Sequence, residues 1–393
     1  FSFLFFDKLN FLSKLKVKYF TFKKTKMNTV RVDIDLILSE FAENPNISDL
    51  HLTCSGRSSY RLNWDIVKDE KIPLINNENM EIILKQLFQN NAQNFDKFIC
   101  DKESDFAYEG KDWTSYRVNA FFEKGKIWIV MRKINSHIRT LEEMMFSNLA
   151  DSIKKNVLTA KKGLFLVTGA TGSGKSTSLV SMIEYINKTR SENVITIEDP
   201  IEYVFEGDKC SISQRQVGHD TRSFKNALKS VMREDPDIIF VGEIRDTETA
   251  ETVLSLAESW HLVFSTLHTS SASHTLSRFI SFFPANMEQS IADRLADSLL
   301  WIQSQMLVKR ADTNARIGIY ELLLNTVAIK NNLKKMDLAQ VDSTIETSPM
   351  YGMISMQQYA KKLVDRQLIN PKDVEHLFRV EDRASQSEGT INN

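Results

Sequence analysis

Apolar and polar positions along the chain follow two different patterns, which meet near residue 160. Before that point, short alternating stretches predict strands, and residues with apolar side chains at helical spacing predict helices. The predicted strands are Asp49–Thr53, Tyr60–Leu62, Ser115–Phe122 and Lys126–Arg132, and the predicted helices are Val30–Glu43 and Glu78–Asn90. We therefore expect a small α+β domain in this part of the chain.

After residue 160, fully apolar runs alternate with helical patterns up to residue 325, which is typical of a parallel α/β sheet. Residues 326–379 have helical patterns throughout. We predict an N-terminal domain at residues 27–135, a linker at 136–160, and a second domain with C-terminal helices at 161–380. The tail at 381–393 is polar, and we expect it to be disordered.

Residues 1–26 differ from the rest of the chain. They contain seven Lys and one Asp among many Phe residues, and they lack a starting Met. We expect a non-native or disordered extension, with Met27 as the true start. The alternative is a basic, aromatic segment that binds a membrane surface.

The overall charge gives no support to a protein that binds nucleic acid through a basic surface. The chain has 50 Lys and Arg against 51 Asp and Glu, so its formal net charge is −1. Cys54, Cys100 and Cys210 are far apart and form no CxxC pair, which favours reduced thiols in a cytosolic protein over a zinc site. No apolar run reaches the length of a membrane-spanning helix.

One motif predicts nucleotide binding. An apolar strand, Leu164–Val167, precedes it, and a helical pattern, Ser176–Lys188, follows it. Glycines in such a loop let backbone N–H groups surround phosphate oxygens, Lys175 reaches the β- and γ-phosphates, and the Ser176 hydroxyl is placed for Mg²⁺. We therefore expect ATP and Mg²⁺ as ligands. The loop residues are Gly169, Ala170, Thr171, Gly172, Ser173, Gly174, Lys175, Ser176 and Thr177.

Three further apolar strands end in polar groups. Glu198 and Asp199 follow one strand, and Glu243 follows the second. His261 and His268 bracket the third, Leu262–Ser265. A carboxylate at the end of such a strand can orient water or hold the Mg²⁺ shell. Each residue also has a plainer interpretation, as a turn residue, a helix-start charge or a structural imidazole, but their order beside one phosphate loop favours a common site.

These motifs resemble those of a known family. The segments GATGSGKST, ITIEDPIEY, QRQVGHDTRSFKNALKSVMREDPDIIFVGEIRD and HLVFSTLHTSSA are similar to the Walker A motif, Asp box, Walker B motif and His box of the type II/IV secretion ATPase superfamily. In particular, the chain resembles the twitching-motility (PilT-like) ATPases of type IV pili. The similarity is strong from Gly163 to about Pro284 and weaker over most of residues 45–378.

The resemblance implies an architecture and a set of roles. It implies an N-terminal PAS-like domain, a RecA-like P-loop NTPase core and a hexameric ring. Glu243 would be the catalytic carboxylate, with Glu198 and Asp199 near the metal and the attacking water. His261 and His268 would sense the nucleotide and the subunit interface. Arg117 and Arg132 would approach the nucleotide phosphates from the N-terminal domain, where the alternative is a pair of surface cations. Asp199 or Glu243 would support the Ser176-bound Mg²⁺ through water.

Two features bear on the branch of the family. The chain lacks the tetracysteine zinc module of pilus-assembly ATPases, which favours retraction. Residues Ala328–Leu333, however, match the AIRNLI signature of retraction ATPases only in part. We expect a cytoplasmic, Mg²⁺-dependent hexameric ATPase at the inner face of the membrane, acting on an inner-membrane platform protein. The alternatives are a secretion or conjugation ATPase and an accessory, PilU-like ring subunit that joins a paralogous ATPase.

The tryptophan positions are unusual. Trp64 lies between two strand patterns and Trp113 follows Asp112, where Asn-Gly and Asp-Gly are preferred in tight turns. Trp260 follows a predicted helix, where glycine is preferred, and the related ATPases have Gly-His where this chain has Trp260-His261. Trp128 and Trp301 also stand where the resemblance implies glycine. We hypothesise that the source organism reads UGA as glycine; the alternative is ordinary substitution.

Overall fold

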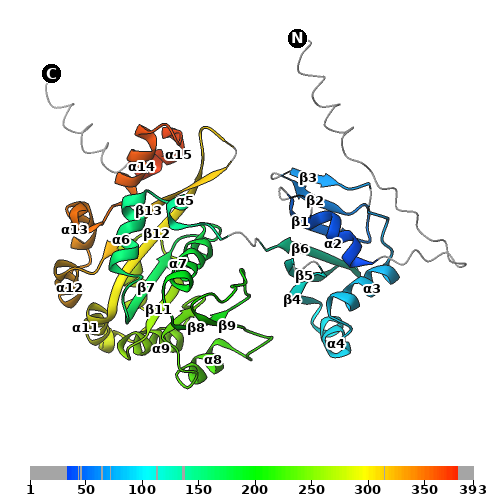
Figure 1. Ribbon diagram of the computed structural model, residues 1–393, viewed down its shortest axis with the longest axis horizontal. Helices are drawn as coiled ribbons and strands as arrows, with labels where there is room; N and C mark the ends of the chain where they lie inside the picture. The colour runs from blue at the N-terminus through cyan, green and yellow to red at the C-terminus, as the bar shows by residue number, and fades with distance from the viewer. Residues whose placement is uncertain are drawn as a thin grey trace, which may run out of the picture. The chain divides into compact units, whose positions relative to one another are not determined.

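The computed structural model describes residues 33–42, 44, 47–62, 65–70, 72–111, 114–134, 138–313 and 315–378. The chain divides into two compact units, Phe1–Lys133 and Ile134–Asn393 (Figure 1). The division falls two residues before the boundary expected at residue 135. Residues 1–32 and 379–393, which include the expected extension and tail, lie outside the described residues.

The first unit is built on a six-stranded antiparallel sheet with the strand order β3-β2-β1-β6-β5-β4. The strands are β1 (Ile47–Thr53), β2 (Ser59–Leu62), β3 (Asp65–Lys68), β4 (Glu103–Glu109), β5 (Ser115–Glu123) and β6 (Lys126–Lys133). The helices are α2 (Ile34–Ala42), α3 (Asn77–Leu87) and α4 (Ala92–Asp101).

Alternation along β5 and β6 places one face of this sheet against the helices. Val118 and Ala120 of β5 are buried with Met80 and Ile83 of α3, as the period of two requires. The Asn76 side chain accepts a hydrogen bond from the Asn79 N–H and thereby caps α3. An α+β unit forms here as expected, while its assignment to the PAS-like type stays a prediction.

The second unit is an α/β unit, as predicted. Its seven-stranded sheet has the order β13-β12-β7-β11-β10-β8-β9, in which only the β12–β13 pair is antiparallel. The strands are β7 (Gly163–Thr168), β8 (Asn193–Glu198), β9 (Ser211–Gln216), β10 (Ile238–Val241), β11 (Leu262–Leu267), β12 (Leu299–Lys309) and β13 (Arg316–Leu324).

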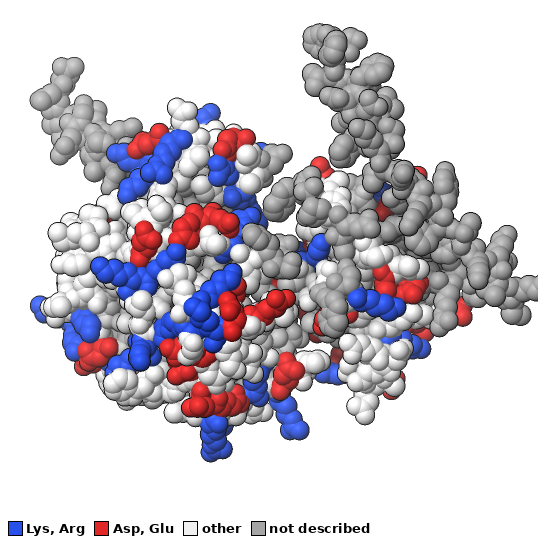
Figure 2. Space-filling model, in the orientation of Figure 1, with Lys and Arg blue, Asp and Glu red and all other residues white. Residues whose placement is uncertain are grey.

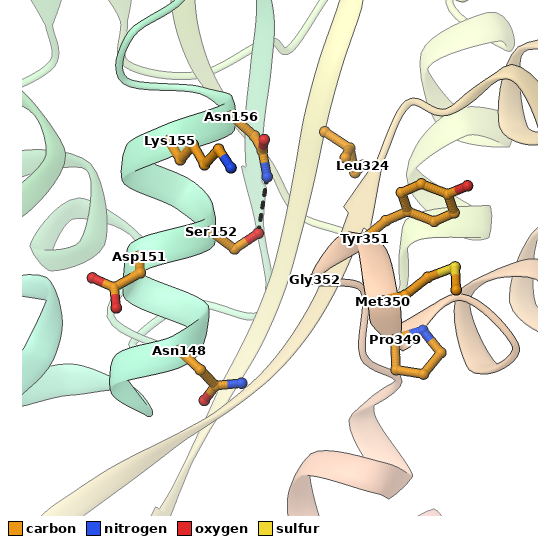
Figure 3. A pocket seen from close by; sticks show the side chains of 10 residues that line it. All are labelled: Asn148, Asp151, Ser152, Lys155, Asn156, Leu324, Pro349, Met350, Tyr351 and Gly352. Carbon is orange, nitrogen blue, oxygen red and sulfur yellow. Dashed lines mark hydrogen bonds between the residues drawn. The ribbon is translucent and has the colours of Figure 1, made fainter.

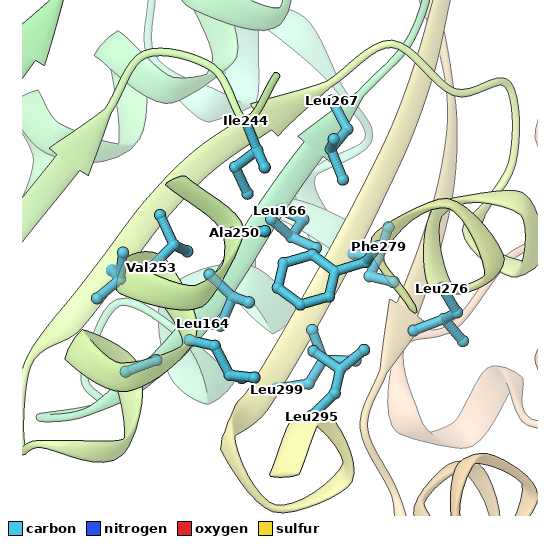
Figure 4. Packing of buried hydrophobic residues seen from close by; sticks show 14 of the residues in the cluster. Leu164, Leu166, Ile244, Ala250, Val253, Leu267, Leu276, Phe279, Leu295 and Leu299 are labelled. Atoms are coloured by element: carbon cyan, nitrogen blue, oxygen red, sulfur yellow. The ribbon is translucent and has the colours of Figure 1, made fainter. Parts of the chain in front are cut away.

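Helices cover both faces of this sheet, so the central strands are buried along their whole length. Leu164 and Leu166 of β7 point into one core, and Phe165 and Val167 point into the other. Figure 4 shows the first core, where Leu164 and Leu166 lie with Val253 and Phe279. Its helices are α8 (Phe224–Val231), α9 (Thr247–Glu258), α10 (Ala272–Ile280), α11 (Glu288–Ser298), α12 (Val327–Lys334) and α13 (Gln340–Glu346).

The second core contains the segment that the sequence analysis assigns to a linker. Its helices are α5 (Leu141–Met144), α6 (Ser147–Asn156), α7 (Lys175–Thr189), α14 (Met356–Asp365) and α15 (Pro371–Val374). Leu149 and Ile153 of α6 are buried here because α6 has an apolar face of its own. Residues 138–160 therefore pack as part of the second unit. Among the described residues, every helix is too short or too polar to cross a membrane.

Candidate nucleotide site

The polar groups predicted to share a site follow neighbouring parallel strands. Thr168 of β7 pairs with Leu267 of β11, Ser265 of β11 with Val241 of β10, and Val241 with Ile197 of β8. Because parallel strands end at one edge of a sheet, the phosphate loop and the groups after β8, β10 and β11 meet at this edge. The shared edge brings together Lys175, Asp199, Glu243 and His268.

Three glycines of the phosphate loop, Gly169, Gly172 and Gly174, have a positive φ, and the first and last of them shape the site. Gly169 has a φ of +147°, and a Cβ there would collide with the Gln305 carbonyl oxygen. Gly174 has a φ of +89° and begins α7 without a side-chain cap. The first N–H groups of this 15-residue helix are therefore left for another acceptor.

Lys175 lies within its own loop. Its Nζ atom donates to the carbonyl oxygens of Gly169 at 2.8 Å and Ala170 at 3.1 Å. Burial lowers the pKa of Lys175 from its usual value, while the charges of Glu243 and Glu202 act in the opposite direction. A phosphate anion in the loop would add a strong counter-charge for this half-buried cation.

The residues present fit a nucleoside triphosphate with Mg²⁺. The uncapped start of α7 suits an anion, and the buried Ser173 hydroxyl has no hydrogen-bond partner among the described residues. The described residues contain no group of three or more His, Cys, Asp or Glu able to hold a metal by itself. Mg²⁺ at a nucleotide site does not need one, because phosphates and water supply most of its ligands. The half-buried Ser176 hydroxyl suits the remaining position.

Glu243 is held from two sides. Nε and Nη2 of Arg245 each donate to its Oε2 at 2.8 Å, and Nε2 of His268 lies 3.2 Å from its Oε1. The loop that carries Glu243 is fixed to both neighbouring strands, since the Gly242 N–H donates to the Ile197 carbonyl and Thr266 Oγ1 donates to the Gly242 carbonyl. The carboxylate is therefore positioned by its surroundings.

The two acidic residues after β8 lie in different environments. Burial raises the pKa of Glu198 to about 7, although hydrogen bonds from Thr196 at 2.7 Å and Gln214 at 3.2 Å favour its charged form. Asp199 is exposed. The hydrogen bond to Glu243 raises the pKa of Arg245, and the charge of Asp199 raises it to a smaller extent. Glu198 is thus a buried group at the end of β8, and Asp199 is an exposed group that follows it.

His261 is not brought to the phosphate loop of its own unit. His261 precedes β11, at the opposite end of that strand from His268, and its Nδ1 lies 3.1 Å from the Leu256 carbonyl oxygen. The two histidines lie seven residue steps apart, on either side of the six-residue strand β11, which is about 23 Å at about 3.3 Å per residue. Within one chain, the structure therefore separates His261 from the site in which the sequence analysis places it.

Arg117 and Arg132 lie side by side on β5 and β6 of the first unit. Nε of Arg132 donates to the buried Asp49 carboxylate at 2.7 Å, while two-thirds of the Arg132 side chain is exposed. The two predicted strands thus pair and place the two arginines next to each other on one sheet. Their approach to the phosphates stays a prediction.

The sequence analysis does not predict two residues near the site, Gln305 and Arg245. Gln305 of β12 is almost fully buried, donates to the Ser173 carbonyl at 2.7 Å and accepts from the Ser178 hydroxyl at 2.8 Å. It braces both sides of the phosphate loop from the next strand. Arg245, which binds Glu243, stands two residues after that carboxylate, and this spacing is a signal that the sequence analysis could have used.

A cleft of about 390 Å³ lies elsewhere, between α6 and the turn before α14 (Figure 3). Ser152 and Lys155 line one side, and Pro349, Met350 and Tyr351 line the other. None of the predicted site residues lines this cleft, so we assign it no role in nucleotide binding. On the face shown in Figure 2, basic and acidic side chains of the described residues are interspersed.

Comparison with known proteins identifies the family. The family model of the type II/IV secretion system protein matches residues 106–383, which is more than half of the chain. The chain therefore belongs to the type II/IV secretion system protein family. Its fold and phosphate loop agree with that assignment.

Individual relatives are similar over most of their length. The type IV pilus retraction ATPase PilT of Pseudomonas aeruginosa is 37% identical over 349 residues, which cover 89% of this chain and 99% of PilT. The type IV pilus ATPase PilU of the same organism is 36% identical over 326 residues, covering 83% of this chain and 84% of PilU. A crystal structure of the pilus retraction motor PilT with bound ADP matches with a TM-score of 0.80 and 37% identity, covering 87% of this chain and 96% of that one.

Proposed function

We propose that this protein is an ATPase motor that drives retraction of a type IV pilus. The observation that carries the proposal is the position of Glu243, held by Arg245 and His268 at the sheet edge where the phosphate loop begins. The likeness to the PilT structure with bound ADP supports nucleotide binding at this loop. The relatives named as pilus ATPases support a role for ATP hydrolysis in pilus retraction.

The residues of the site divide the work of phosphoryl transfer. Lys175 and the N–H groups at the start of α7 hold the phosphates and stabilise the charge that develops on them. Glu243 orients the attacking water, and His268 fixes the carboxylate. Bound Mg²⁺ neutralises phosphate charge, and Ser176 would hold it, with Asp199 or Glu243 contributing through water. Arg117 and Arg132 would complete the charge around the phosphates from the first unit.

The work requires partners. We propose that six copies form a ring at the cytoplasmic face of the inner membrane and act on a platform protein there. A second candidate, an accessory subunit beside a paralogous ATPase, is favoured by the similarity to PilU and by the partial match of Ala328–Leu333 to the retraction signature. A secretion or conjugation ATPase is the remaining alternative.

Deletion of the gene tests the proposed use of hydrolysis. A retraction motor predicts cells with excess pili that do not retract, and restoration of retraction by the wild-type gene but not by Lys175→Ala. Restoration by Lys175→Ala would favour the accessory role. Normal pili together with a defect in protein export would overturn the proposal in favour of secretion.

A further inference from the structure

The backbone at Trp260 adopts a conformation that suits glycine. Helix α9 ends with the cap residue Ser259, and Trp260 follows with a φ of +71°. The first residue beyond a helix cap often adopts this left-handed conformation, where glycine is preferred because it has no Cβ. Among the described residues, the other seven non-glycine residues with positive φ are Asn, Asp, Gln, Lys or Met. Trp260 is thus the one aromatic residue among them.

Packing does not compensate for this strain. The Trp260 side chain is 74% exposed, so it gains little from burial. Its one contact of note is with Lys162, whose Nζ lies 4.1 Å from the ring centroid, and such exposed cation–π contacts are weak. The environment of residue 260 therefore offers no physical reason for an indole.

The sequence between β2 and β3 of the first unit also has a tryptophan at a position that favours glycine. Leu62 of β2 pairs with Asp65 of β3, so two residues, Asn63 and Trp64, stand between the paired positions in the sequence, and both lie outside the described residues. Two-residue hairpin loops favour Asn-Gly, because the second residue needs a positive φ. The β5–β6 hairpin of this chain obeys that rule, since Lys124 and Gly125 have φ values of +51° and +75°. Trp64 stands where that hairpin has glycine.

The fully buried Trp301 and the partly buried Trp128 each have an indole N–H without a hydrogen-bond partner among the described residues. Both Nε1 atoms are buried. Buried tryptophans usually find such a partner. Trp113, the fifth tryptophan, lies outside the described residues. The chain also has only 13 glycines in 393 residues, about half of the roughly 7% in ordinary proteins.

We propose that all five tryptophan positions are glycine in the native protein. A single cause accounts for them: the source organism inserts glycine at UGA, and the sequence was translated with a code that reads UGA as tryptophan. The residues are Trp64, Trp113, Trp128, Trp260 and Trp301, and they are all the tryptophans of the chain. The native protein would then contain none.

The codons and the native protein test this proposal. UGA at all five positions, with glycine in the native peptide that spans residue 260, is the expected result, and UGG at Trp64 or Trp260 overturns it. UGA codons with tryptophan in that peptide overturn it as well. Protein purified from the source cells should show tyrosine but no tryptophan fluorescence.

The strain at residue 260 is tested separately in recombinant protein that has tryptophan at all five positions. Trp260→Gly should raise the Tm by about 2–4 °C. Trp260→Ala is the matched control, because it removes the indole but keeps the strained Cβ, and it should give no such rise. A Trp260→Gly protein that is no more stable than Trp260→Ala would contradict the strain argument. None of these outcomes depends on whether the protein hydrolyses ATP.

Discussion

His268 Nε2 lies 3.2 Å from Glu243 Oε1 and links the ends of two neighbouring parallel strands. The contact joins the residue that follows β11 to the carboxylate that follows β10. The imidazole of His268 can therefore fix one oxygen of the Glu243 carboxylate, and Arg245 contacts the other oxygen.

Gln305 braces the phosphate loop, so its loss should weaken nucleotide binding. Gln305→Ala leaves the buried Ser173 carbonyl without its donor, and an unpaired buried group costs about 1–3 kcal/mol. We expect the Kd for ATP to rise about tenfold or more, measured by calorimetric titration.

Ser178→Ala is the matched control for Gln305. It removes only the second contact of the same glutamine and leaves the Ser173 carbonyl paired. We expect a smaller change in the Kd. An unchanged ATP affinity in folded Gln305→Ala would show that β12 does not support the loop.

Burial of Glu198 should make stability depend on pH. Its folded pKa of about 7 lies above the usual value of 4.5, so the folded state binds more protons than the unfolded state between these values. Its contribution to stability is therefore complete below about pH 4.5 and is lost as the pH rises through about 7. The loss is at most about 3 kcal/mol, from about 1.4 kcal/mol for each pKa unit.

Glu198→Gln should flatten this decline in the free energy of unfolding, measured by denaturant titration from pH 4.5 to 8. Glu321 is a matched second case, since burial raises its pKa to about 7 as well, and it accepts a hydrogen bond from the Ala272 N–H. Glu248→Gln, at an exposed carboxylate, is the control. Parallel pH profiles for wild type and Glu198→Gln would refute the assignment of a raised pKa.

Arg245 should act on turnover more than on binding, because it contacts Glu243 and not the phosphate loop. Removing a hydrogen bond to a charged group costs about 1.5–3 kcal/mol, so Arg245→Ala should lower kcat roughly ten- to hundredfold with a smaller change in KM. Arg245→Lys keeps the charge but has one donor nitrogen where arginine has two in contact with Glu243, and it should recover part of the rate.

Arg310→Ala breaks an exposed ion pair elsewhere in the same unit and should have no effect on turnover. The steady-state kinetics of all three variants provide the check. If Arg245→Ala raised KM and left kcat unchanged, Arg245 would be a binding residue instead.

Arg117 and Arg132 are predicted to complete the site from the first unit. If they contact the transferred phosphoryl group, removal of either charge should lower kcat by orders of magnitude, about as arginine fingers do, with less effect on ATP affinity. The assay is steady-state ATPase on assembled rings, with Arg57→Ala as a control at an exposed arginine of the same unit. Wild-type rates in both variants would make the two arginines surface cations.

The sequence predicts the parts of the site that depend on strong local signals. The phosphate loop and the strands that lead to Glu198 and Glu243 have strict patterns, and parallel pairing then brings their ends together. Gln305 lies 132 residues beyond Ser173 and reaches it only because β12 pairs with β7, a long-range contact that no local pattern specifies.

For His261, a local motif predicts a position in the site that the structure does not show. His261 belongs to the same motif as His268, but one strand of six residues separates them, so motif membership does not place both at one edge. The sequence analysis assigns residues 136–160 to a linker and does not predict the packed helices α5 and α6. These helices are short, with four and ten residues. Short helices carry a weak periodic signal and acquire their stability from tertiary packing.

The ATPase activity of Glu243→Gln tests the central claim most directly. The variant keeps the size and shape of the side chain but loses the negative charge that orients the attacking water, and its NH2 group replaces one of the two acceptor oxygens that contact Arg245 and His268. We expect it to bind ATP with an affinity close to that of the wild type and to hydrolyse it at least about a hundredfold more slowly, from the size of typical general-base effects. Glu248→Gln, an exposed carboxylate on α9, should hydrolyse ATP at the wild-type rate. Undiminished turnover by purified Glu243→Gln would contradict the assignment of Glu243 as the catalytic carboxylate.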